Sequence, residues 1–159
     1  MKTKVNENIY NIGVNDYDID LFEGQYILEN GMAYNSYIVL DNKIAVLDTV
    51  DKIAVDIWFD NLADALGDKK PDYLIVQHLE PDHSFGIQKF IEKYPDTVLY
   101  CSASALRMLP QFCDVDLSKV IAVKEGETLD LGTHKLNFMM APMVHWPEVM
   151  VTYLSLIHI

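Results

Sequence analysis

Four side chains of the kinds that bind metals lie within six consecutive residues. They are two imidazoles, His78 and His83, and two carboxylates, Glu80 and Asp82. In an extended segment, residues two apart face the same side, so His78, Glu80 and Asp82 are expected to converge while His83 reaches a neighbouring position. Imidazole suits iron and zinc, and carboxylates add hard oxygen ligands and negative charge. The residue types and their spacing therefore indicate a metal site.

The flanking sequence predicts that this cluster lies in a loop between a strand and a helix. Residues 73–76 form a short apolar run typical of a buried strand, and apolar residues recur at helical spacing over 85–91. Pro81 disfavours helical backbone at Glu80 and keeps that residue extended. The alternative is a solvated polar loop whose histidines only cap the next helix. Four ligand-type side chains in six positions rarely arise for capping alone.

The pattern His78-x-Glu80-x-Asp82-His83 resembles the iron-binding motif of the flavodiiron proteins (A-type flavoproteins), a branch of the metallo-β-lactamase superfamily. Residues 30–37 and 145–148 also match the family, so the resemblance covers nearly the whole chain. Zinc hydrolases of the superfamily carry His-x-His-x-Asp-His, so Glu80 stands where they have their second histidine. An anionic carboxylate favours the oxidised metal, which suits redox iron better than Lewis-acid zinc.

The resemblance implies two iron ions with separate ligands. The first iron would take His78, Glu80 and His145, and the second would take Asp82 and His83. Two further family ligands, a bridging aspartate beyond His145 and a more distant histidine, have no counterpart in this sequence. By itself His145 would be an ordinary loop histidine. Trp146 would lie near the metals, where it could shield them, contact flavin or simply pack.

The order of predicted elements suits the αββα sandwich that the resemblance implies, an α/β (α+β) metallo-β-lactamase-like fold of which the chain would hold the N-terminal portion. Periodicity alone supports only a mixed α/β class, with parallel pairing where strands and helices alternate. In the first third of the chain we expect strands over 9–14 and 16–22 joined near Asn15, one strand over 32–39, and a hairpin through Asp41-Asn42 into 43–49. We then expect a helix over 53–66 ended by Gly67, a strand over 97–101, and a helix capped by Ser102 and ended near Pro110. The last expected strands cover 120–123, 127–131 and 134–142.

Residues 1–154 are expected to form one incomplete diiron domain. Residues 155–159 do not match the family sequence that follows Thr152-Tyr153, and they resemble the translated adapter tails of some metagenomic gene fragments. His158 is therefore not expected to be a ligand. The chain would then be a truncated piece of a longer protein that also has the rest of the sandwich and a flavodoxin-like domain for flavin mononucleotide (FMN).

Several other residues that could do chemistry are interpreted as structural. Asp48, at the end of an apolar strand, is expected to cap the next turn, although a functional role stays open. Trp58 is expected in the core, and His134, on a turn, is expected to be exposed. Cys101 and Cys113 do not form a C-x-x-C pair and are expected to be core or surface thiols.

Composition narrows the function classes. The 159 residues are enough for one domain with a core, and 50% hydrophobic with 23% charged residues is ordinary for a soluble globular protein. No apolar run approaches the length of a membrane span and the N-terminus lacks an apolar signal core, so we expect a cytoplasmic protein away from membranes. The net charge of -12 opposes binding to nucleic acid.

For the full-length parent, the resemblance implies a non-haem diiron oxidoreductase that reduces dioxygen to water, nitric oxide to nitrous oxide, or both. Electrons would come from FMN, supplied by rubredoxin or a related reductase, in a head-to-tail homodimer. A zinc metallo-hydrolase of the wider superfamily is the second hypothesis, and Glu80 counts against it. The third is that this chain alone, without two of the family's ligands, is inactive.

Overall fold

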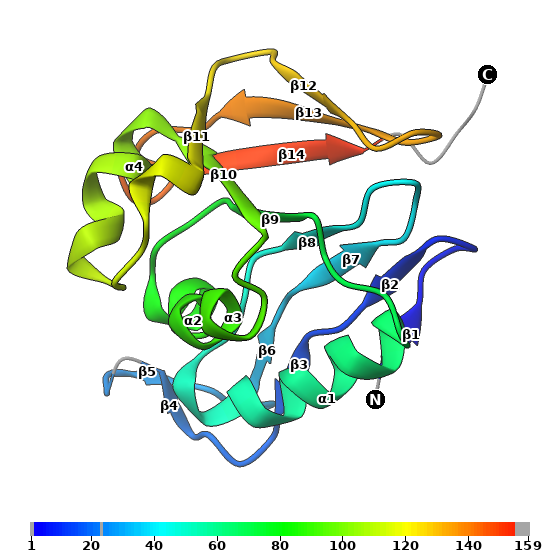
Figure 1. Ribbon diagram of the computed structural model, residues 1–159. Helices are drawn as coiled ribbons and strands as arrows, with labels where there is room; N and C mark the ends of the chain where they lie inside the picture. The colour runs from blue at the N-terminus through cyan, green and yellow to red at the C-terminus, as the bar shows by residue number, and fades with distance from the viewer. Residues whose placement is uncertain (1, 23, 155–159) are drawn as a thin grey trace.

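Two β-sheets face each other, and helices cover the outer side of the larger one, within residues 2–22 and 24–154, the part of the chain that this computed structural model describes (Figure 1). The larger sheet has the order β1 (Thr3–Lys4), β2 (Ile9–Asn11), β7 (Tyr37–Val39), β8 (Ala45–Leu47), β9 (Tyr73–Val76), β10 (Val98–Ser102) and β11 (Val120–Val123). The smaller sheet has the order β12 (Thr128–Asp130), β13 (Lys135–Met140) and β14 (Met150–Leu154). Two short pairs join β3 (Val14–Asp16) to β6 (Met32–Tyr34) and β4 (Leu21–Phe22) to β5 (Tyr26–Ile27).

The crossover helices make the centre of the larger sheet parallel. Strands β8, β9, β10 and β11 pair in parallel, whereas β7 and β8 form the predicted antiparallel hairpin through Asp41-Asn42. The connecting helices are η1 (Lys52–Ala54), α1 (Val55–Leu66), α2 (Pro81–Ser84), α3 (Ile87–Lys93), α4 (Ala103–Met108), η2 (Leu109–Gln111) and η3 (Leu117–Lys119). The predicted parallel pairing is confirmed.

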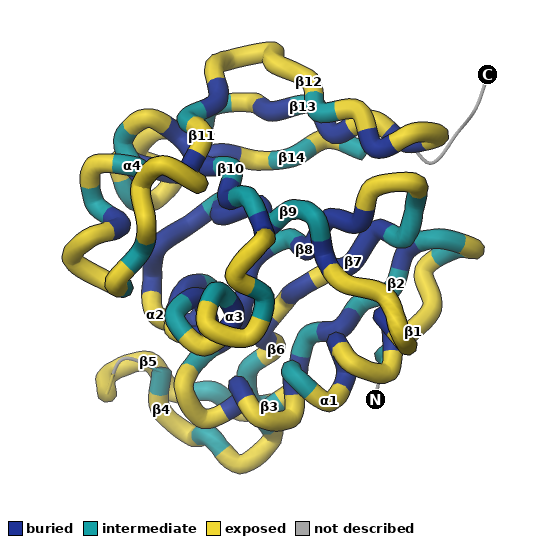
Figure 2. The backbone as a smooth tube through the Cα atoms, viewed as in Figure 1, coloured by how far each residue is buried: buried dark blue, intermediate teal, exposed yellow. Residues whose placement is uncertain are grey.

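Alternating residues of the central strands enter two separate cores. Leu74 packs with the helices, while its neighbour Ile75 packs with the smaller sheet, as the period of two in a strand requires. Trp58 is fully buried on the helix side and Phe138 is fully buried between the sheets. Figure 2 shows the buried central strands between exposed outer loops. The prediction of Trp58 as a core residue is confirmed.

Helix ends follow the predicted signals. Helix α1 ends at Gly67, whose φ of 57° is in the left-handed region that glycine adopts readily. Ser102 caps α4, because its hydroxyl accepts a hydrogen bond from the backbone N–H of Ala105 at 3.0 Å. Helix α4 then passes into η2 around Pro110. Among the described residues, no helix has the length and apolar character needed to cross a membrane.

Several predicted strand boundaries are wrong, and residues 17–20 of the strand predicted over 16–22 are not in a strand. Asn15 lies inside β3, where it pairs with Ala33, and does not join two strands. The single strand predicted over 32–39 is divided into β6 and β7, which belong to different sheets. The break falls at Ser36, whose buried hydroxyl donates to the backbone oxygen of Asp48 and accepts from the indole N–H of Trp58. Hydrophobic periodicity does not reveal where a chain changes sheets.

The expectation of an exposed His134 is also wrong. Its turn lies against the β7–β8 turn, its residue exposure is 6%, and its Nδ1 is 2.8 Å from Oδ2 of Asp41. The same oxygen accepts from the backbone N–H groups of Thr133 and His134 and from the Thr133 hydroxyl. Burial by itself would raise the pKa of Asp41, but these hydrogen bonds outweigh burial and lower that pKa well below its usual range. These hydrogen bonds join the β7–β8 turn of the larger sheet to the β12–β13 turn of the smaller sheet.

Candidate metal centre

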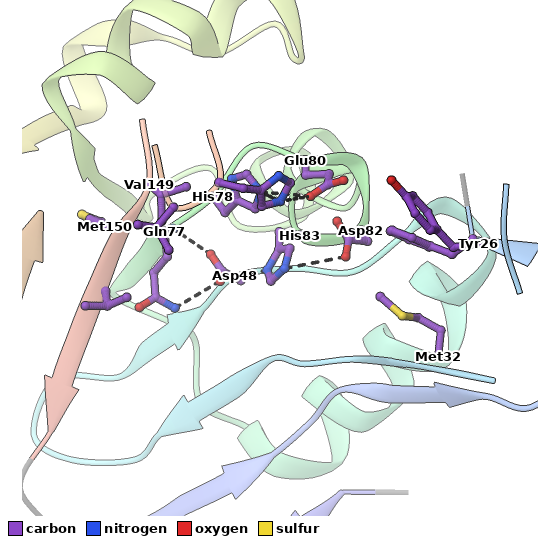
Figure 3. Close-up of a pocket in the computed structure, with 14 residues that line it drawn as sticks. Tyr26, Met32, Asp48, Gln77, His78, Glu80, Asp82, His83, Val149 and Met150 are labelled. Carbon is purple, nitrogen blue, oxygen red and sulfur yellow. Dashed lines mark hydrogen bonds and ion pairs between the residues drawn. The ribbon is translucent and has the colours of Figure 1, made fainter. Parts of the chain in front are cut away.

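The metal-type cluster consists of His78, Glu80, Asp82 and His83. It lies at the carboxyl ends of β8 and β9, where the chain passes from β9 into α2 (Figure 3). Glu80 has φ -58° and ψ 143°, so it is extended immediately before Pro81, as predicted. Asp82 and His83 lie within the short helix α2, so the two-residue periodicity used for Asp82 does not apply. Asp82 enters the cluster because the chain turns into α2, and it is not aligned along an extended strand.

Three side chains converge on one point. Oε2 of Glu80 lies 3.0 Å from Nε2 of His78 and 2.8 Å from Nε2 of His145, and the two ring nitrogens are 3.3 Å apart. One potential ligand atom from each residue lies within 4.8 Å of the others. His78 and Glu80 are buried, whereas the His145 side chain, from the connection between β13 and β14, is 67% exposed. Two imidazoles and one carboxylate of this kind can bind a transition metal.

A second pair lies beside this group. Oδ2 of Asp82 is 3.7 Å from Nε2 of His83, and the rings of His78 and His83 have centroids 5.3 Å apart. Oδ1 of Asp82 is buried and has no hydrogen-bond partner among the described residues. Burial, reinforced by Glu80 and opposed by His83, raises the pKa of Asp82. The sequence-predicted residues are therefore brought together as one group of three and one group of two.

Asp48 belongs to this site and does not cap its own turn. Its carboxylate accepts hydrogen bonds from the backbone N–H of Gln77 at 2.7 Å and from the Gln77 amide at 3.1 Å. Its Oδ2 is also 3.2 Å from Nδ1 of His83. Although burial opposes the effect, Asp48 raises the pKa of His83. The sequence contained one signal for this role of Asp48. It follows the apolar strand β8, which pairs in parallel with β9, and the motif follows β9.

Glu148 is a further buried carboxylate at the site. Its Oε1 lies 2.7 Å from Nδ1 of His78 and accepts from the backbone N–H of Leu79 at 3.0 Å. Sequence analysis used Glu148 only as part of the 145–148 match. Trp146 stands perpendicular to the His78 ring at 5.2 Å between centroids and is partly buried against the helix-side core. Its observed contacts are packing contacts that also cover one side of His78.

A cavity of about 580 Å³ opens over the cluster. Its polar lining includes the five predicted ligands together with Asp48 and Gln77. Part of its wall is apolar, and Figure 3 shows Tyr26 and Met32 on the Asp82 side. Such a mixture of apolar wall and a few convergent polar groups is typical of small-molecule sites.

The remaining metal-type residues lie elsewhere or outside the described residues. Cys101 is fully buried, and burial raises the pKa of its thiol to about 12. Burial also raises the pKa of the Cys113 thiol to about 11. Both are free thiols, as predicted. His158 and the predicted tail 155–159 lie outside the described residues.

Comparison with known proteins identifies the family. A family model described as "ODP family beta lactamase" matches residues 32–159. The chain belongs to this family. It is 33% identical over 157 residues to the anaerobic nitric oxide reductase flavorubredoxin of Vibrio vulnificus, covering 98% of this chain and 32% of that protein. The resemblance to flavodiiron proteins inferred from the motif is thereby confirmed.

Solved structures agree. The flavodiiron protein from Giardia intestinalis superposes with a TM-score of 0.89 at 25% identity, over 97% of this chain and 37% of its own. Rubredoxin oxygen:oxidoreductase from Desulfovibrio gigas gives 0.87 at 31%, over 96% and 38%. A B3 metallo-β-lactamase described as having an active-site glutamic acid gives 0.72 at 16%, over 96% and 56%, which shows the fold alone. The predicted fold class is confirmed.

The chain is much shorter than these homologues. It spans 32% of the Vibrio protein, 37% of the Giardia structure and 38% of the Desulfovibrio structure. The names of the Vibrio and Desulfovibrio proteins describe oxidoreductase enzymes that act on nitric oxide or oxygen.

Proposed function

We propose that this chain is the diiron domain of a flavodiiron oxidoreductase that reduces dioxygen to water, nitric oxide to nitrous oxide, or both. The observation that carries the proposal is the convergence of His78, Glu80 and His145, with ligand atoms within 4.8 Å of one another. Beside them lies the buried Asp82, one of whose oxygens has no hydrogen-bond partner among the described residues. Residues 1–154 would form this domain.

The side chains fit iron by charge and by donor type. Buried carboxylates that lack enough hydrogen-bond donors require a cation, because an uncompensated buried charge is costly. Glu80 and Asp82 provide anionic oxygen, and His78, His83 and His145 provide imidazole nitrogen, a mixture that suits non-haem iron. The first iron would take His78, Glu80 and His145. The second would take Asp82 and His83.

The surrounding residues have separate tasks in this proposal. The iron pair, when bound, would supply the electrons and the Lewis acidity that a diatomic substrate needs. Glu80 adds negative charge, which makes the reduced site a stronger reductant. The apolar part of the cavity wall, with Tyr26 and Met32, would contact a small neutral substrate. Trp146 covers one side of His78 and would be the residue that contacts flavin.

The electron supply is proposed from the homologues. The names flavorubredoxin and rubredoxin oxygen:oxidoreductase support a donor of the rubredoxin type. FMN would belong to another domain of the whole protein and would reach the iron site across a head-to-tail homodimer.

Anaerobic loading with ferrous iron, followed by oxidation and Mössbauer spectroscopy, tests the proposal. We expect a spin-coupled diferric signal that Glu80→Ala and Asp82→Ala each remove. The Asp41→Asn variant, altered at the opposite end of β8, should keep the signal and serves as the control. Isolated mononuclear iron only, or no bound iron, would contradict the proposal.

A zinc metallo-hydrolase is the second candidate. The fold is shared with a B3 metallo-β-lactamase described as having an active-site glutamic acid. In that case the same side chains would hold zinc, which would supply an activated water for hydrolysis of an ester, thioester or lactam, and Asp82 would orient that water. Hydrolysis of such substrates by zinc-loaded protein, lost in Asp82→Ala, would favour the hydrolase over the oxidoreductase.

A further inference from the structure

Glu148 is among the most deeply buried charged residues that the structure describes, with 1% of its surface exposed. It lies seventy positions from His78 in sequence, yet its Oε1 is 2.7 Å from Nδ1 of that ring. The backbone N–H of Leu79 donates to the same oxygen at 3.0 Å. A carboxylate placed this deeply is costly unless it has a defined partner, and its partners are the metal-type loop itself.

The main chain at Glu148 is anchored independently of its side chain. The hydroxyl of Ser102, the cap of α4, donates to the backbone oxygen of Glu148 at 2.7 Å. Two residues later, the backbone N–H of Met150 donates to the backbone oxygen of Gln77 at 3.0 Å. The carboxylate is therefore held at a fixed position beside Nδ1 of His78.

The partners of the two ring nitrogens decide which nitrogen of His78 carries its proton. A neutral imidazole has one N–H donor and one acceptor nitrogen. Oε1 of Glu148 accepts from Leu79 and can only accept from Nδ1, but Nε2 also faces a carboxylate oxygen, that of Glu80 at 3.0 Å. A metal ion bound at Nε2 would take the lone pair of that nitrogen, which leaves Nδ1 of His78 as the donor to Glu148. Nε2 is then left with its lone pair directed at the point where Glu80 and His145 converge.

We propose that Glu148 is a positioning residue that fixes His78 as the Nδ1–H tautomer, with Nε2 presented to a metal ion. This inference rests on the proposed function only in assuming that a metal binds at the His78 group. A carboxylate that accepts the outer N–H of a ligating histidine fixes the ring and makes it a better ligand. Because Glu148 follows His145 by three residues, one loop provides both a ligand and the residue that orients the other ligand.

The pair Asp41–His134 provides a matched control. Its oxygen-to-nitrogen distance is 2.8 Å, and both side chains are buried, with 4% and 6% exposed. It lies in the turn before β8, whereas the metal-type cluster follows the other end of that strand. Loss of this pair should affect folding stability without affecting a metal site.

Cobalt(II) titration of the unchanged protein, Glu148→Leu, Glu148→Gln and Asp41→Leu tests the inference. Leucine removes the acceptor, and we expect cobalt affinity to fall about 10- to 100-fold. Glutamine keeps an amide oxygen that can accept from both N–H groups, so most of the affinity should return. Asp41→Leu should lower the thermal midpoint and leave cobalt affinity unchanged. Equal affinity in Glu148→Leu and the unchanged protein would overturn the inference alone, as would an equal loss in Asp41→Leu.

A second measurement does not depend on any variant folding. In the unchanged protein loaded with zinc and labelled with ¹⁵N-histidine, NMR should show a slowly exchanging Nδ1–H for His78. A proton on Nε2, or an Nδ1 without a proton, would overturn the inference. Failure of the unchanged protein to bind either cobalt or zinc would overturn the proposed function, and this inference with it.

Discussion

The two ends of strand β8 each carry a buried carboxylate beside a histidine, yet they differ in how their oxygens are satisfied. At the Asp41 end, Oδ2 accepts from four donors on Thr133 and His134, and Oδ1 accepts from the backbone N–H of Asn42. Every oxygen of this carboxylate has partners within the protein. The end therefore has no need of a cation.

At the opposite end, two buried carboxylate oxygens have no hydrogen-bond partner among the described residues. Asp48, Glu80, Asp82 and Glu148 gather around His78 and His83. The two oxygens are Oδ1 of Asp82 and Oε2 of Glu148. The comparison teaches that a buried carboxylate–histidine pair does not by itself indicate a metal site. Buried carboxylate oxygens that lack a hydrogen-bond donor, such as those of Asp82 and Glu148, are the feature that indicates one.

The largest expected effect is at the metal end. Replacing His78 with alanine removes a ligand atom from the group of three, so affinity for the first metal should fall more than about 100-fold, since changes behind a ligand already cost about 10- to 100-fold. Cobalt titration measures the loss, with Asp41→Asn as the reference. Unaltered affinity in His78→Ala would mean that the metal binds elsewhere.

At the Asp41 end the expected effect is on folding. Asp41→Asn removes a charged acceptor of several hydrogen bonds and should lower the free energy of unfolding by about 2 kcal/mol. Because the folded-state pKa of Asp41 is lowered, its contribution is fully present above the unfolded value near 3.8 and is lost as the pH falls below it.

Urea unfolding at pH 7 and at about pH 2 to 3 measures this contribution. The difference between Asp41→Asn and the unchanged protein should be largest at pH 7 and smaller at the acid pH. An equal difference at both, or a change in metal affinity, would remove the distinction between the two ends.

Metal selectivity should respond to Glu80 by a smaller factor. Glu80→His restores the histidine-rich pattern of the zinc hydrolases and should move preference from iron toward zinc by about tenfold, equivalent to about 1.4 kcal/mol. Competition between the two metals, followed by elemental analysis, measures the change. Unchanged iron selectivity would show that the carboxylate does not set the preference.

The smallest expected effect separates the two groups of the site. Asp82→Asn replaces a buried, incompletely satisfied carboxylate with a neutral side chain of the same shape, so the metal-free chain should gain about 1 kcal/mol of stability. The same variant should lose the second metal while keeping the first at His78, Glu80 and His145. Thermal unfolding without metal, and metal analysis after loading, check the two statements separately. A metal-free Asp82→Asn chain that is less stable would mean that the carboxylate is satisfied.

Local sequence signals predicted much of the positioning scaffold. The apolar run before His78 predicted β9, Pro81 predicted the extended backbone of Glu80, and Ser102 predicted the start of α4. These features depend on neighbouring residues only, which is why the sequence reveals them. The distant His145 was expected from the family resemblance, and the structure brings it to 2.8 Å from Glu80.

Features that depend on contacts between distant segments were missed. His134 was expected to be exposed, because nothing in its own turn indicates that the Asp41 turn lies against it. Asp48 was interpreted as a cap, because its partners Gln77 and His83 come from another strand and helix. The role of Glu148 depends on a loop that returns to His78. Periodicity and spacing describe one segment at a time and do not report such pairings.

Anaerobic competition between ferrous iron and zinc, followed by counting metal per chain, tests the central claim most directly. The account predicts that iron is retained first at the group of three, with a second iron bound more weakly at Asp82 and His83. It also predicts that the Glu80→Gln, Asp82→Asn double variant loses both. Clear zinc preference, or equal iron retention by the double variant, would contradict the claim that excess carboxylate at this end of the sheet holds iron.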